Sequence, residues 1–245
     1  MIASEQLIHP DWPAPAHVRA LQTTRLGGIS AAPYDSLNLG GHVGDVSLAV
    51  ARNRMALNAL FPGEPVWLEQ VHGTTVVDGD AASCAPSADA CIARQRGSVC
   101  VVMTADCLPV LLCDAAGTVV GAAHAGWKGL AAGVIEATVQ AMRVPPPTLM
   151  AWLGPAISQS AFEVGEEVRA EFMRHDARAA AAFIPGRESG KWLADIYVLA
   201  RQRLNALGIT QVYGGDDCTY REQHKFFSYR RDGVTGRMGT FIWLA

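Results

Sequence analysis

Three short segments each place a histidine or a cysteine among small residues, and they are the part of the sequence best suited to chemistry. Each supplies one possible metal ligand or nucleophile: His72 in residues 69–73, Cys107 in residues 104–109 and His124 in residues 122–129. Small neighbours let a substrate approach the backbone closely. The separations along the chain fit no compact ligand motif, so the fold would have to bring the three together. Taken singly, such a histidine is more often structural and a buried cysteine is usually inert.

Cys107 lies between two apolar runs, residues 99–103 and 109–113, which predict two buried strands. The chain has six cysteines and none of the paired spacings of a structural zinc or redox motif. We expect free thiols in a reducing compartment. Cys100 and Cys113, inside the apolar runs, are expected to be small buried hydrophobic residues. The remaining cysteines are Cys84, Cys91 and Cys218.

His124 falls where a predicted strand meets a predicted helix. Residues 118–123 predict the strand, and Gly126 and Gly129 permit a tight connection into a helix over 130–142. Ligands often bind at the carboxyl ends of strands in α/β sheets. The position therefore favours a functional role for this histidine.

The remaining patterns predict a mixed α/β (α+β) fold: one domain over residues 1–245, with a central mixed sheet flanked by helices. Half of the residues are apolar, which is enough for a sizeable core. The other expected elements are strands at 148–153, 211–213 and 239–244 and helices at 166–175 and 193–207.

Composition and charge point to a small-molecule partner in the cytoplasm. The formal net charge is −3, and the basic residues are dispersed, which argues against nucleic acid or an anionic membrane as partner. Residues 1–15 lack the basic start and apolar run of a signal peptide, and no run of about 18 apolar residues follows. The oligomeric state cannot be read from these patterns.

The chain resembles the YfiH-like family, variously described as purine nucleoside phosphorylase, multicopper polyphenol oxidoreductase or laccase-like protein, and peptidoglycan editing factor. The resemblance covers nearly the whole chain. It is carried, in order, by TTRLGGIS (23–30), SLNLG (36–40), NR (53–54), QVHG (70–73), TADCLP (104–109), HAGWKG (124–129), LGPAI (153–157), FEVG (162–165) and FSYRRD (227–232).

The resemblance implies a zinc site formed by His72, Cys107 and His124, and copper is also possible there. Two imidazoles and one thiolate suit zinc, and three protein ligands leave a fourth position open, as a catalytic site requires. Cys107 and His124 are also catalytic candidates, together with Asp106. This aspartate is expected to carry a proton or orient a ligand, or else to cap a turn.

Binding of a nucleoside and phosphate would require cationic and polar partners. Our candidates are Arg25, Arg54 and Lys128, for which an ordinary surface charge is the alternative. Trp127 is expected in the core rather than stacked on a base.

The leading functional prediction, implied by the resemblance, is phosphorolysis of adenosine, inosine or 5′-methylthioadenosine, with adenosine deamination at the same metal site. A second reading treats Cys107 and His124 as a nucleophile and base that hydrolyse a peptidoglycan precursor. A copper polyphenol oxidase is less favoured, because the seven histidines include no His-X-His pair. A metal-binding module without catalysis remains a further alternative.

Overall fold

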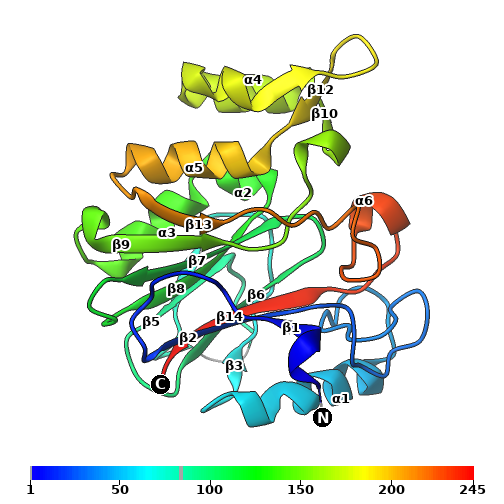
Figure 1. The fold of residues 1–245 in the computed structure, drawn as a ribbon, viewed down its shortest axis with the longest axis vertical. Helices are drawn as coiled ribbons and strands as arrows, with labels where there is room; N and C mark the ends of the chain where they lie inside the picture. Colours follow the sequence, from blue (N-terminus) through cyan, green and yellow to red (C-terminus); the bar gives the residue numbers. More distant parts are fainter. Residues whose placement is uncertain (1, 83–84) are drawn as a thin grey trace.

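The computed structural model describes residues 2–82 and 85–245, and its elements are stacked in layers (Figure 1). Two large sheets lie face to face. A helix covers the outer face of the first sheet, and further helices cover the outer face of the second (Figure 1). The helices are α1 (Ser47–Leu57), α2 (Trp127–Ala132), α3 (Val134–Met142), α4 (Glu166–His175), α5 (Ile196–Ala206) and α6 (Tyr229–Asp232).

The first sheet has the strand order β1-β2-β14-β6-β3, and the second has the order β13-β9-β7-β8-β5-β4. Both are mixed, because β3 pairs with β6, β13 with β9 and β4 with β5 in parallel. The strands of the first sheet are β1 (Leu7–Ile8), β2 (Val18–Thr23), β14 (Met238–Leu244), β6 (Val99–Thr104) and β3 (Pro65–Val66). Those of the second are β13 (Gln211–Gly214), β9 (Leu149–Leu153), β7 (Leu108–Asp114), β8 (Val120–Ala125), β5 (Ala90–Ala93) and β4 (Val76–Asp78).

A small antiparallel sheet lies beside α4 at the far end of the molecule from α1 (Figure 1). Its order is β10-β12-β11, with β10 at Glu163–Gly165, β12 at Lys191–Ala194 and β11 at Phe183–Pro185. Short 3-10 helices complete the described elements, at Ser4–Gln6, Asn58–Leu60, Pro146–Thr148, Gln159–Ala161 and Ala177–Ala182.

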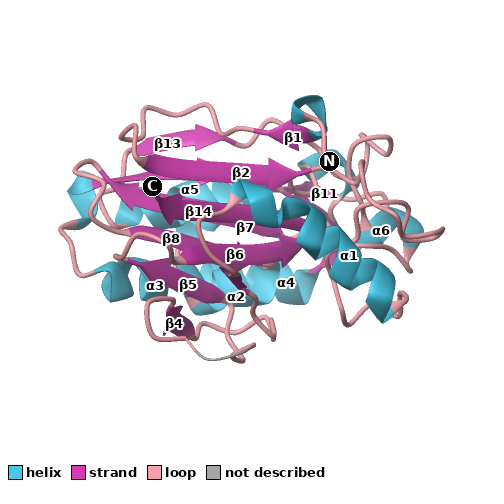
Figure 2. Ribbon diagram, turned by 90° about the horizontal axis from the view of Figure 1, so that it is seen from below, coloured by secondary structure: helices cyan, strands magenta, loops and turns pink. Residues whose placement is uncertain are grey.

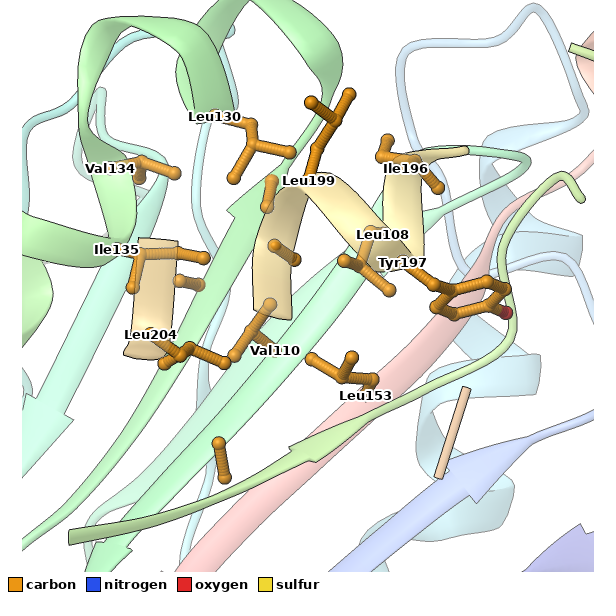
Figure 3. Packing of buried hydrophobic residues seen from close by; sticks show 14 of the residues in the cluster. Leu108, Val110, Leu130, Val134, Ile135, Leu153, Ile196, Tyr197, Leu199 and Leu204 are labelled. Carbon is orange, nitrogen blue, oxygen red and sulfur yellow. The ribbon is translucent and has the colours of Figure 1, made fainter. Parts of the chain in front are cut away.

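The strand β7 is buried along its whole length and apolar from Leu108 to Cys113, as is typical of a strand covered on both faces. Successive side chains of a strand point to opposite faces. Val110 and Leu112 accordingly pack against the helices, with Leu130 among their neighbours (Figure 3). Leu111 and Cys113 belong instead to the core between the two large sheets.

Helix α1 covers the outer face of the first sheet (Figure 2). Its Leu57 is fully buried in a cluster with Val101 of β6 and Phe241 of β14. Sequence patterns gave no expectation for this helix.

The predicted fold class is confirmed, and the strands divide between two large sheets where we expected one central sheet. The predicted strands at 99–103 and 109–113 are confirmed as β6 and β7, and the helix at 166–175 is α4. The helix expected over 130–142 is instead two, because Gly133 adopts a φ of +102° between α2 and α3. The helix expected from residue 193 begins at Ile196, because the Asp195 side chain caps it by accepting from the Val198 amide.

Cys100 and Cys113 are fully buried, as predicted. The five cysteines within the described residues are free thiols, and Cys84 lies outside those residues. Within the same part of the chain, every helix is too short or too polar to cross a membrane.

Candidate metal centre

The fold brings His72, Cys107 and His124 together, although they are far apart in sequence. Their candidate ligand atoms all lie within 4.8 Å of one another. Cys107 Sγ is 3.9 Å from His72 Nε2, and the two imidazole rings are 4.8 Å apart between centroids. Within residues 2–82 and 85–245, no second group of three or more possible metal ligands comes together in this way.

Strand pairing explains why Cys107 and His124 meet. In the antiparallel β7–β8 pair, Leu108 lies opposite Ala125 and Pro109 opposite His124. Cys107 directly precedes β7, so it comes beside the end of β8, where His124 is the next-to-last residue. The strand β8 extends two residues beyond the predicted 118–123, so His124 is held within the sheet rather than after it.

A buried aspartate holds both histidines, and sequence reasoning missed it. The Asp89 carboxylate, fully buried, lies 2.8 Å from His124 Nδ1 and accepts from the amides of Val71 at 3.2 Å, His72 at 2.9 Å and Gly73 at 2.6 Å. With Nδ1 engaged, His124 presents Nε2 to a ligand, as is usual for metal-binding histidines.

The carboxylate also stabilises an unusual backbone conformation at His72, whose φ is +60°. Burial raises the pKa of Asp89, but hydrogen bonds from His124 and from the Gly73 and Val71 amides outweigh it, so the pKa lies below its ordinary value. The only sequence signal was an aspartate directly before the apolar run of β5.

The residues present fit a tetrahedral zinc ion. Ideal zinc–ligand lengths place a sulfur and a nitrogen ligand roughly 3.6 Å apart, close to the 3.9 Å between Cys107 and His72. Gly126 keeps the space open, because a Cβ there would lie 2.9 Å from Cys107 Sγ and 2.9 Å from a His72 ring carbon. The three ligands leave the fourth zinc position free for water or substrate.

In the absence of a metal, Cys107 and His124 shift each other's pKa in opposite directions. Burial raises the pKa of Cys107, but the His124 charge and hydrogen bonds from both histidines outweigh burial and lower the pKa to about 6. Burial lowers the pKa of His124, but the Cys107 charge and the Asp89 hydrogen bond raise it to about 9. At neutral pH the metal-free pair is therefore a thiolate and an imidazolium.

We expect iodoacetamide to alkylate Cys107 of the chelator-treated protein rapidly at pH 7, because the thiolate is the reactive form. With its pKa lowered to about 6, the rate should fall as the pH drops below 6 and level off above it. Cys113 is the control, because burial, aided by the Asp114 charge, raises its pKa to about 12. Peptide mapping by mass spectrometry gives both rates. Rebinding zinc should protect Cys107, and an unchanged rate with zinc would contradict its role as a ligand.

The three candidate ligands line a cavity of about 370 Å³. The other residues lining it include His42, Thr104, Tyr229 and Arg237. Sequence reasoning assigned no role to these four: Thr104 and Tyr229 lie within the TADCLP and FSYRRD segments, and His42 and Arg237 lie outside the quoted motifs. Gln70 also lines the cavity, and its side-chain amide is bonded to both backbone groups of Met103, so its role there is to fasten the 70–73 segment to β6.

Asp106 lies next to Cys107 but its carboxylate is engaged elsewhere. One oxygen accepts from the Thr219 hydroxyl at 2.6 Å and the other from the Arg230 amide at 2.6 Å. Asp106 has a φ of +95° and ties the C-terminal loops to the site. Its predicted role as proton carrier stays a prediction.

The three predicted phosphate ligands are not brought to this cavity. Arg25 donates to the carbonyls of Asp35 and Gln223, and Arg54 donates twice to the Leu39 carbonyl. Arg54 also stacks on Trp67, with its Cζ 3.8 Å from the ring centroid. Lys128 is exposed, with its Nζ 5.7 Å from the Trp127 ring. Their binding of substrate stays a prediction.

Comparison with known proteins identifies relatives over nearly the full chain. A family described as multi-copper polyphenol oxidoreductase laccase matches residues 19–245. The chain is 57% identical over 242 residues to a purine nucleoside phosphorylase YfiH of Escherichia coli (strain K12), covering 98% of this chain and 99% of that protein. It is 49% identical over 241 residues to a purine nucleoside phosphorylase of Haemophilus influenzae, covering 97% of this chain and 99% of the relative.

Solved structures show the same fold. A crystal structure of a Neisseria meningitidis protein superposes with a TM-score of 0.93 at 53% identity, covering 98% of this chain and 99% of the other. A hypothetical protein YfiH of Bacillus licheniformis gives a TM-score of 0.86 at 32% identity, with 93% of each chain covered. These matches confirm the resemblance to the YfiH-like family.

Proposed function

The chain belongs to the family described as multi-copper polyphenol oxidoreductase laccase, whose YfiH-named members it matches nearly end to end, and we propose that it is a purine nucleoside phosphorylase. The observation that carries the proposal is that the three candidate ligands line a cavity large enough for a small organic ligand. The names of the relatives supply the substrate class. We propose adenosine, inosine and 5′-methylthioadenosine as substrates.

In phosphorolysis a phosphate oxygen forms a bond to C1′ of the ribose while the bond from C1′ to purine N9 breaks. The electron pair of that bond leaves with the base, which takes up a proton, and the products are the free purine and ribose 1-phosphate. A zinc ion held by His72, Cys107 and His124 would supply a Lewis acid to a purine or water oxygen. Asp89 fixes the direction of the buried His124.

We propose adenosine deaminase activity at the same cavity. There water adds its oxygen to C6 of the purine and ammonia leaves, so that adenosine becomes inosine without phosphate. The shared cavity supports this proposal because both reactions act on the same nucleoside.

The test of phosphorolysis is its dependence on phosphate. Incubation with inosine should yield hypoxanthine and ribose 1-phosphate, at a rate that rises with phosphate concentration and saturates. Chromatography of the base together with an assay for ribose 1-phosphate measures both products. Deamination of adenosine in phosphate-free buffer is the internal control. Release of hypoxanthine with free ribose, at a rate independent of phosphate, would contradict the assignment.

One observation favours a second candidate, a Cys–His hydrolase. The lowered pKa of Cys107 beside the raised pKa of His124 is the arrangement of an activated thiol nucleophile. A hydrolase of this kind acting on a cell-wall precursor would work without metal, whereas the phosphorylase should lose activity on chelation. Turnover of peptidoglycan fragments by the chelated protein would favour the hydrolase.

A further inference from the structure

The hydroxyl of Thr104 is buried in the cavity wall without a hydrogen-bond partner. Thr104 is 1% exposed, it lines the cavity, and its Oγ1 has no partner among the residues that the structure describes. A buried hydroxyl left unpaired is energetically unfavourable. At the wall of a ligand cavity, a bound ligand atom can supply the missing hydrogen-bond partner.

Arg237 lines the same cavity and is a cation with free donors. Its Nη1 donates to the Thr235 and Gly236 carbonyls at 3.0 Å each. Within the described residues its Nε and Nη2 make no hydrogen bond, and no carboxylate lies within 4.0 Å to form an ion pair. No other arginine or lysine of the described chain lines this cavity.

Strand pairing brings together the two segments that carry these groups. Thr104, the last residue of β6, lies opposite Met238, the first residue of β14, and Arg237 directly precedes Met238. Thr104 is also three residues before Cys107. Both side chains line the cavity that His72, Cys107 and His124 also line, so a small ligand bound there can contact either group.

The positive charge of Arg237 has no free negative partner nearby in the part of the chain that is described and would be stabilised by a bound anion. Burial lowers its pKa, and of the groups that oppose burial the two largest contributors are Cys107 and Asp106, ahead of Tyr229 and Tyr34. Cys107 is a metal ligand and both Asp106 oxygens are already bonded. Neither group is thus free to neutralise the guanidinium directly.

We propose that Thr104 and Arg237 form the subsite that receives phosphate, with the Thr104 hydroxyl and the free Arg237 nitrogens donating to its oxygens. The inference rests on the proposed phosphorylase function and names a different subsite from the Arg25, Arg54 and Lys128 predicted from the sequence. A forked guanidinium and a hydroxyl are typical ligands of a phosphate dianion. Both groups line the cavity that the candidate metal ligands line, which fits an anion that must approach a nucleoside there.

The test compares Arg237→Gln, Arg237→Lys, Thr104→Val and Thr104→Ser in the zinc-loaded protein. Arg237→Gln should raise the KM for inorganic phosphate about 10- to 100-fold, the range of a charge-assisted hydrogen bond. Thr104→Val should raise it about tenfold and Thr104→Ser should restore it. The KM for inosine and the phosphate-free deamination of adenosine should change little. Thr138→Val, which removes a buried hydroxyl on α3, is the matched control and should leave both KM values unchanged.

Binding of inorganic phosphate to the zinc-loaded protein, measured by calorimetry without nucleoside, separates the two proposals. Binding that Arg237→Gln abolishes, in a protein without phosphorolysis, would support the subsite and refute the proposed function. Phosphorolysis with an unchanged KM for phosphate in Arg237→Gln and Thr104→Val would refute the subsite and leave the function standing. Weaker inhibition by inosine 5′-monophosphate in these variants, with the KM for inorganic phosphate unchanged, would assign the subsite to a nucleotide and overturn the proposal.

Discussion

Cys107→Ala should leave a folded protein that has lost both tight zinc binding and nucleoside turnover. Cys107 is only partly buried, so its removal costs little core packing. Without the thiolate only two protein ligands remain, fewer than the three of a typical catalytic zinc site. We therefore expect zinc affinity to fall by more than the 10–100-fold that loss of an outer-sphere partner causes. Elemental analysis should find one zinc per chain in the unaltered protein and none in the variant.

Cys113→Ala is the matched control for this experiment. Cys113 is a fully buried thiol on β7, packed between the two sheets and away from the cluster. Its loss should cost roughly 1 kcal/mol of stability and leave zinc content and activity within a few fold. Equal losses of activity in the two variants would mean that Cys107 is only another packed thiol.

The apolar strands and the glycine-rich connection after His124 were accessible from the sequence because they follow local rules. The runs that became β6 and β7 are continuous hydrophobic stretches of strand length. Gly133 was not recognised as a helix break, since an isolated glycine inside an apolar helical pattern is often tolerated. The division into two sheets also escaped prediction, because a strand buried on both faces looks the same in either arrangement.

The site residues likewise divide into those that sequence motifs predicted and those that only the folded structure brings together. The three metal-ligand candidates were found through family motifs, whereas Thr104 and Arg237 meet only through the pairing of β6 with β14. Arg25 and Arg54 belong to the motifs, yet the structure uses their guanidinium groups to hold backbone carbonyls of surrounding loops. A residue of a family motif can thus stabilise the fold rather than bind the ligand, and the sequence alone does not distinguish the two roles.

Asp89 is the clearest case of a residue whose importance depends on tertiary contacts, and Asp89→Asn should weaken both fold and metal site. An ionised carboxylate only accepts, and here it receives four donors: His124 Nδ1–H and the amides of residues 71–73. An asparagine oxygen can keep His124 and His72, but its NH₂ group would then face the amides of Val71 and Gly73. Each buried donor left unpaired costs about 1–3 kcal/mol. The free energy of unfolding of the zinc-free protein should fall by about 2–5 kcal/mol.

Zinc affinity should fall about 10- to 100-fold in the same variant, because the segment carrying His72 loses its anchor and His124 loses its charged partner. Chelator competition measures the affinity and denaturant titration the stability. Asp114→Asn is the matched control, since Asp114 is also buried but binds the amides of Thr118 and Val119 at the opposite end of β7. It should lose stability and keep its zinc affinity. If both variants lose stability and both keep zinc affinity, Asp89 serves only to fasten the loop and the two histidines are held in place by other contacts.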